Sequence, residues 1–116
     1  IFIDEFKNLF KKYEPTITLF SLKNMSGKQK FLRFEDDKIC LTFDYVNNKK
    51  NLLFMSEVDS LYTKYDILPS IAKDSRVSKE TIMNSYKDEF IKFKDGLYDY
   101  DKKRVYQSEI SNRLEI

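Results

Sequence analysis

Apolar residues recur at helical spacing near both ends of the first half of the chain. The first set stands at i, i+3, i+4 and i+7 with lysines between its members: Phe6, Leu9, Phe10 and Tyr13. This spacing predicts an amphipathic helix over residues 3–13, which Pro15 ends because the residue before a proline disfavours the α conformation. The same kind of repeat predicts a second amphipathic helix over residues 50–65.

Between these helices, β-branched and aromatic residues predict three strands. The first covers residues 16–22, a short second strand begins at Phe31, and the third covers residues 39–46. Alternation in the third strand directs one set of side chains to the core: Ile39, Leu41, Phe43 and Tyr45. The opposite face either meets water or lines a pocket, and it carries Cys40, Thr42 and Asp44. Hairpin-length connections then favour an antiparallel sheet with helices on one face, which is an α+β fold.

The second half of the chain is predicted to be mainly helical. Ser78 suits the N-cap of a helix over residues 79–97, either continuous or broken near Lys87, with Gly96 as its stop. A turn is predicted over residues 98–104 and a short closing helix over residues 108–114.

This helical tail, residues 70–116, contains no run of residues that could form a sheet of its own. Its apolar face must therefore pack on residues 1–69 or on a part of the protein outside this chain. We treat residues 1–69 as one unit and residues 70–116 as a dependent C-terminal segment.

Composition excludes several function classes. The 21 basic and 19 acidic residues are well mixed, whereas a nucleic-acid interface needs a basic stripe on one face. One cysteine and no histidine exclude an internal disulfide, a Cys/His zinc site and a Ser-His-Asp or Cys-His catalytic arrangement. We therefore expect no metal site and no nucleic-acid partner.

The N-terminus lacks both a basic segment and an initiator methionine. It does not resemble a signal peptide, and it suggests the start of a fragment of a longer chain. Without an export signal, the cytoplasm is the expected location.

The stretch of residues 71–76, Ile-Ala-Lys-Asp-Ser-Arg, places three charges directly after apolar positions. Together with the ending Val-Tyr-Gln-Ser-Glu-Ile-Ser-Asn-Arg-Leu, residues 105–114, it resembles the C-terminal part of FAD-linked oxidases of the vanillyl-alcohol-oxidase type. The closest branch is the decaprenylphosphoryl-ribose oxidases and their bacterial relatives. Residues 20–23 and 41–45 resemble, more loosely, two strands of the same proteins.

This resemblance implies that the chain is incomplete. Residues 1–69 would be part of the substrate-binding (cap) domain, and residues 70–116 would pack on an FAD-binding domain that lies N-terminal of this region. With only two glycines, Gly27 and Gly96, the chain cannot build a dinucleotide-cradling loop. The fragment alone would be inactive, and the partner that holds FAD would be the missing domain of the same polypeptide.

The resemblance also implies roles for individual residues. Lys73 would sit at the flavin and the substrate, as a catalytic and cofactor-contacting residue. Lys23, Cys40 and Thr42 would line the substrate pocket. The residues alone leave simpler alternatives open: Lys73 as a surface lysine paired with Asp74, Lys23 as a solvated strand end, and Cys40 as a small buried apolar group.

Three further charged residues are expected to be structural, forming ion pairs and helix-end contacts that tie the tail to the missing domain: Asp74, Arg76 and Arg113. The substrate class implied is a sugar or alcohol hydroxyl, as in a polyprenyl-phosphoryl sugar, a polyol or a sugar lactone. The alternative is a stand-alone α+β module that binds a protein or a small ligand without catalysis.

Overall fold

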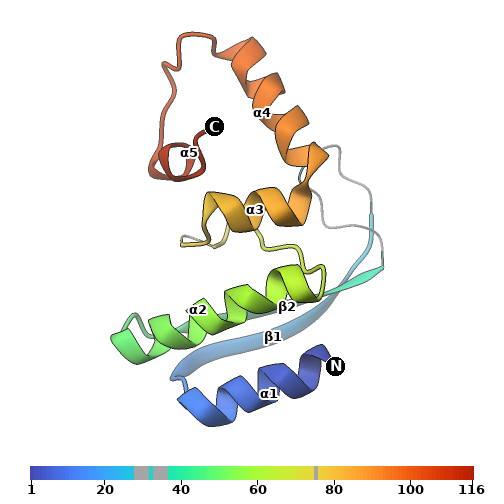
Figure 1. The fold of residues 1–116 in the computed structure, drawn as a ribbon, viewed down its shortest axis with the longest axis vertical. Coiled ribbons are helices and arrows are strands. Elements are labelled where there is room, and N and C mark those ends of the chain that lie inside the picture. Colours follow the sequence, from blue (N-terminus) through green and yellow to red (C-terminus); the bar gives the residue numbers. More distant parts are fainter. Residues whose placement is uncertain (28–31, 33–36, 75) are drawn as a thin grey trace.

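The computed structural model describes residues 1–27, 32, 37–74 and 76–116. In chain order its elements are α1 (Phe2–Tyr13), β1 (Ile17–Met25), β2 (Lys38–Tyr45), α2 (Lys49–Lys64), α3 (Lys79–Tyr86), α4 (Asp88–Tyr100) and α5 (Glu109–Leu114) (Figure 1). Helices pack on an antiparallel sheet and a helical part ends the chain, so the α+β prediction is confirmed.

The sheet is a two-stranded hairpin among the described residues. β1 and β2 are antiparallel, with Phe20 opposite Phe43 and Leu22 opposite Leu41. β1 continues to Met25, three residues beyond its predicted end, because β2 still pairs with it there. The short strand predicted from Phe31 lies outside the described residues.

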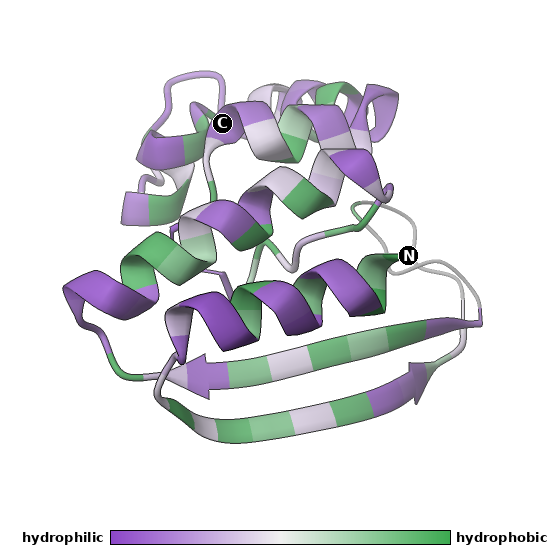
Figure 2. Cartoon of the chain, turned by 60° about the horizontal axis from the view of Figure 1, so that its bottom comes forward, coloured by the Kyte–Doolittle hydropathy of each residue, from purple (hydrophilic) through white to green (hydrophobic). Residues whose placement is uncertain are grey.

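Helices α1 and α2 cover one face of the hairpin and form the first core. Its buried members come from these two helices: Phe6, Phe54, Met55 and Val58. Three of the four predicted core residues of β2 pack against this cluster: Leu41, Phe43 and Tyr45. The prediction is wrong for Ile39, which is 70% exposed. Figure 2 shows the reason, since the start of β2 extends beyond the end of α1 and no helix covers it.

The C-terminal helices and the segment before them enclose a second core. Its buried residues lie in or beside α3, α4 and α5: Val77, Ile82, Tyr86, Phe90, Leu114 and Ile116. Tyr62 of α2 packs against both cores and joins them. The buried apolar residues of the tail therefore pack on one another and on Tyr62 of the first unit.

The break near Lys87 is confirmed, and the predicted stop at Gly96 is wrong. Lys87 has a φ of 48°, which ends α3 and begins α4 in a new direction. Gly96 lies inside α4, where a glycine costs only about 1 kcal/mol relative to alanine. The chain turns instead at Asp101, whose carboxylate accepts hydrogen bonds from the backbone N–H groups of Val105 and Tyr106, at 2.9 and 2.8 Å. These two bonds lower the pKa of the Asp101 carboxyl group.

Among the described residues, no helix combines the length and the apolar character needed to cross a membrane.

Candidate functional site

Backbone hydrogen bonds first hold the loop around Lys73, whose described residues are 71–74 and 76. The N–H groups of Lys73 and Asp74 both donate to the Ser70 carbonyl, at 3.0 and 2.8 Å. One oxygen of the Asp74 carboxylate then accepts from the backbone N–H groups of Arg76 and Val77, both at 2.9 Å. An aspartate that binds the backbone two and three residues further on stabilises a tight turn. The local sequence therefore bends the chain immediately after Lys73.

An ion pair attaches the loop to α2. The guanidinium group of Arg76 binds both carboxylate oxygens of Asp59, with Nη2 to Oδ1 at 2.6 Å. The two side chains are only 21% and 22% exposed, so solvent screens the pair weakly. The hydrogen bonds to Asp59 raise the pKa of Arg76 further above its usual range. Asp74 also lies 3.5 Å from the same guanidinium group.

The last helix holds the loop from the other side. Arg113 of α5 donates to the backbone carbonyls of Val77 and Asp74, the latter at 3.1 Å. The expected ion pairs and helix-end contacts are thus present, but their partners lie within this chain. The two stretches that carry the family resemblance, residues 71–76 and 105–114, are in direct contact through this arginine.

We expect the variant Arg113→Met to lose about 1–3 kcal/mol of unfolding free energy, because it leaves two partly buried carbonyls without their donor. Amide hydrogen exchange at Arg76 and Val77 should accelerate in the same variant. Lys92→Met is the matched control, since it removes one positive charge from an exposed position on α4. Equal urea midpoints for the two variants would show that Arg113 does not hold the loop.

Lys73 projects from this fixed loop with an exposed side chain. Its ammonium group forms no ion pair or hydrogen bond with any residue that the structure describes. The alternative of a surface lysine paired with Asp74 is not what the fold contains, because Asp74 binds Arg76 and the backbone. Among the described residues, Lys73 is therefore an unpaired cation on a loop that hydrogen bonds and an ion pair attach to its neighbours.

The predicted pocket residues of the hairpin lie together on its other face. Lys23 is the cross-strand partner of Cys40, and Thr42 pairs with Ser21. The Sγ atom of Cys40 lies 3.6 Å from the Oγ1 atom of Thr42, and both side chains are half-buried, whereas Lys23 is exposed. This face alternates with the apolar face that α1 and α2 cover. It presents a thiol, two hydroxyls and an ammonium group, beside Leu19 and Asp44 on the same face.

The loop and the polar hairpin face are separate surfaces. Figure 1 shows the segment from α2 to α3 running back between these two helices, whereas the hairpin lies with α1 on the other side of α2. No hydrogen bond or ion pair within the described part of the chain joins Lys73 to Lys23, Cys40 or Thr42. The structure thus brings three of the four predicted site residues together and leaves Lys73 apart from them.

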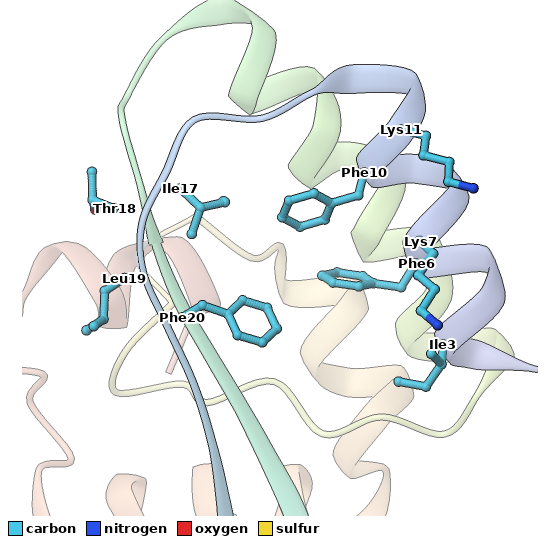
Figure 3. Close-up of a pocket in the computed structure, with 9 residues that line it drawn as sticks. All are labelled: Ile3, Phe6, Lys7, Phe10, Lys11, Ile17, Thr18, Leu19 and Phe20. Atoms are coloured by element: carbon cyan, nitrogen blue, oxygen red, sulfur yellow. The ribbon is translucent and has the colours of Figure 1, made fainter.

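A groove between α1 and β1 was not predicted. It has a volume of about 670 Å³ and an almost wholly apolar lining (Figure 3). The rings of Phe6 and Phe10 point from α1 toward Phe20 of β1. The available signal in the sequence was the run Leu19-Phe20-Ser21-Leu22, which places large apolar residues on both faces of one strand. A strand with one face in water does not need them.

Other site types find no support. No group of three or more cysteine or acidic residues within the described ranges is arranged to hold a metal ion. Comparison with known proteins adds no family: the chain matches no protein-family model, no curated protein and no solved structure.

Proposed function

We propose that this chain is the C-terminal part of an FAD-dependent oxidoreductase that oxidises a sugar or alcohol hydroxyl, with Lys73 as its contribution beside the flavin. The observation that carries the proposal is the ammonium group of Lys73, which has no partner among the described residues, on a loop held by both α2 and α5. A surface lysine needs no such support, whereas a group that acts on a cofactor must be held in place. The loop and the chain ending are the two stretches that resemble the oxidase family, and their contact through Arg113 further supports the proposal.

The residues present fit a contact with FAD but not its retention. An exposed cation suits a ring that becomes negatively charged on reduction. The chain has no glycine-rich loop for the pyrophosphate, because Gly27 stands alone beyond β1 and Gly96 lies within α4. FAD, when bound, supplies the hydride acceptor. Residues outside this sequence would hold it, in a protein that we place in the cytoplasm.

Within this proposal, Lys73 has an electrostatic task. Its ammonium group would stabilise negative charge on the reduced ring or orient the substrate hydroxyl. Arg76 pairs with both Asp59 and Asp74, so these three side chains carry one net negative charge at the base of the loop, and neither carboxylate forms an ion pair with Lys73. On the substrate side, polar groups would come from Lys23, Cys40 and Thr42. Their surface is separate from Lys73, so the rest of the cap domain would have to connect it with the flavin.

The direct test is flavin reduction in the full-length protein. We expect Lys73→Ala to slow reduction by substrate by about 10²–10³-fold, the usual cost of one charge-stabilising donor. Lys92→Ala, which removes an exposed lysine in the first half of α4, should leave the rate unchanged. Equal rates for the two variants would remove Lys73 from the site.

A second measurement separates this proposal from a stand-alone binding module. The full-length protein should purify with the absorbance spectrum of a flavin, whereas the 116-residue chain alone should bind none. A full-length protein that carries no flavin and takes up none would favour the module and reject the oxidase.

A further inference from the structure

The groove between α1 and β1 is bordered by apolar side chains that no element of the described structure covers. Leu19, Phe20 and Leu22 of β1 are 54%, 50% and 64% exposed. Phe20 and Leu22 lie on the face of β1 that looks toward the helices, opposite Phe43 and Leu41, whereas Leu19 lies opposite Asp44 on the other face. Two adjacent exposed apolar side chains on one face differ from the singly scattered apolar residues of an ordinary surface, and such patches mark interaction sites. A small ligand would leave most of this surface in water, whereas a polypeptide could cover its length.

The backbone of β1 offers a second point of attachment. Within the described residues, β1 has β2 as its sole strand partner, so the peptide groups on its other edge have no strand to bind. An open edge of this kind recruits an added strand, and main-chain hydrogen bonds then supply the affinity. The edge therefore favours an extended partner over a helical one.

The charges at the groove specify the composition of that partner. Lys7 and Lys11 lie on successive turns of α1 at its rim, and neither forms an ion pair with a described residue (Figure 3). None of the described residues that line the groove is acidic. Residues at i and i+4 of a helix have Cβ atoms roughly 6 Å apart, and alternate residues of a strand are about 6.6–6.8 Å apart. Two carboxylates at alternate strand positions can therefore meet both lysines.

We propose that an extended peptide strand docks along the free edge of β1, covers Phe20 with apolar side chains and presents two alternate carboxylates to Lys7 and Lys11. A second copy of this chain does not fit this description. Its own β1, Ile17–Met25, contains no acidic residue and could not supply the carboxylates. The inference rests on the groove alone and is independent of the proposed oxidase activity.

The test is a titration of the isotope-labelled 116-residue chain with the synthetic peptide acetyl-Val-Thr-Glu-Thr-Glu-Thr-Val-amide, followed by amide NMR shifts. We expect saturable shifts in β1 and α1. The same peptide with lysine in place of glutamate should bind about tenfold more weakly, since two surface ion pairs are replaced by repulsion. Of two peptides N-methylated at alternate residues, one should lose binding, because one edge of the peptide must pair with β1.

Charge reversal in the protein gives the matching comparison. The double variant Lys7→Glu, Lys11→Glu should reverse the preference between the two peptides, and Lys7→Gln, Lys11→Gln should remove it. Lys102→Glu, Lys103→Glu changes the net charge equally at exposed positions elsewhere and should keep the preference.

Three results would overturn the inference. They are the absence of shifts at millimolar peptide, equal binding of the glutamate and lysine peptides, and a dimer of the chain whose interface contains β1. The first would leave the groove without a peptide partner, the second would leave the lysines without a role, and the third would make a second copy the occupant.

Discussion

Phe54→Ala is expected to lower the free energy of unfolding by about 3–5 kcal/mol, the largest effect of any single truncation in the first core. Phe54 is fully buried and its ring meets the rings of Phe10, Phe6 and Phe43 at centroid distances of 5.3, 6.0 and 6.2 Å. One side chain thus joins α1, β2 and α2. Small domains have only about 5–15 kcal/mol of stability in total, so this variant should be close to unfolding.

The neighbouring residue supplies the control. Leu53 is 53% exposed on the same helix, so Leu53→Ala should cost well below about 1 kcal/mol. Urea unfolding followed by circular dichroism measures both variants. Similar midpoints would mean that the first core does not form around Phe54.

Asn51→Leu is expected to cost about 2–3 kcal/mol, although it adds apolar bulk at a fully buried position. The Asn51 side chain accepts from the Thr16 N–H at 3.0 Å and donates to the carbonyls of Thr16 and Val46 at 3.2 and 2.7 Å. These bonds attach the start of β1 and the end of β2 to the first turn of α2. Leucine would leave all three groups without this partner.

An aspartate at the same position makes the test sharper. Asn51→Asp keeps the acceptor for Thr16 but, when ionised, cannot donate to either carbonyl. Burial should raise the pKa of the new carboxyl in the folded state, so the stability that the protonated form provides is lost as the pH rises. The variant should therefore lose more stability, relative to the parent chain, at neutral pH than at acidic pH. Asn84→Leu, at an exposed position on α3, should show neither a large loss nor a pH dependence.

The elements themselves follow from local patterns. The i, i+4 repeat of Phe6 and Phe10 required a helix, and the alternation of Leu41, Phe43 and Tyr45 required a strand. Ser78 begins α3 by accepting from the Thr81 N–H, as its position before a helical repeat predicts. The prediction at Gly96 is wrong because a glycine ends a helix only where the backbone turns left-handed, and here Asp101 provides the turn.

The candidate site also combines features that the sequence predicts with features that it does not. Cys40 and Thr42 share a face because alternate residues of any strand do, and sequence alone predicts this. Nothing in the sequence indicates that Asp59 would bind Arg76 or that Arg113 would reach the loop. Asp59 and Arg76 are 17 residues apart, and Arg113 is 39 residues from Asp74. Pairings at such separations depend on how helices pack, which no local repeat records.

Sequence by itself determined the helices, the hairpin strands, the α+β class and the chemistry that this chain cannot perform without histidine or a second cysteine. Tertiary structure alone decided that the tail packs on α2, that Lys73 is unpaired within the described part of the chain while Asp74 and Arg76 are paired, and that an apolar groove lies open beside Lys7 and Lys11. The physical reason is the range of the interactions. Backbone conformation and side-chain periodicity act over a few residues, whereas burial and ion pairing depend on which surfaces the folded chain brings together.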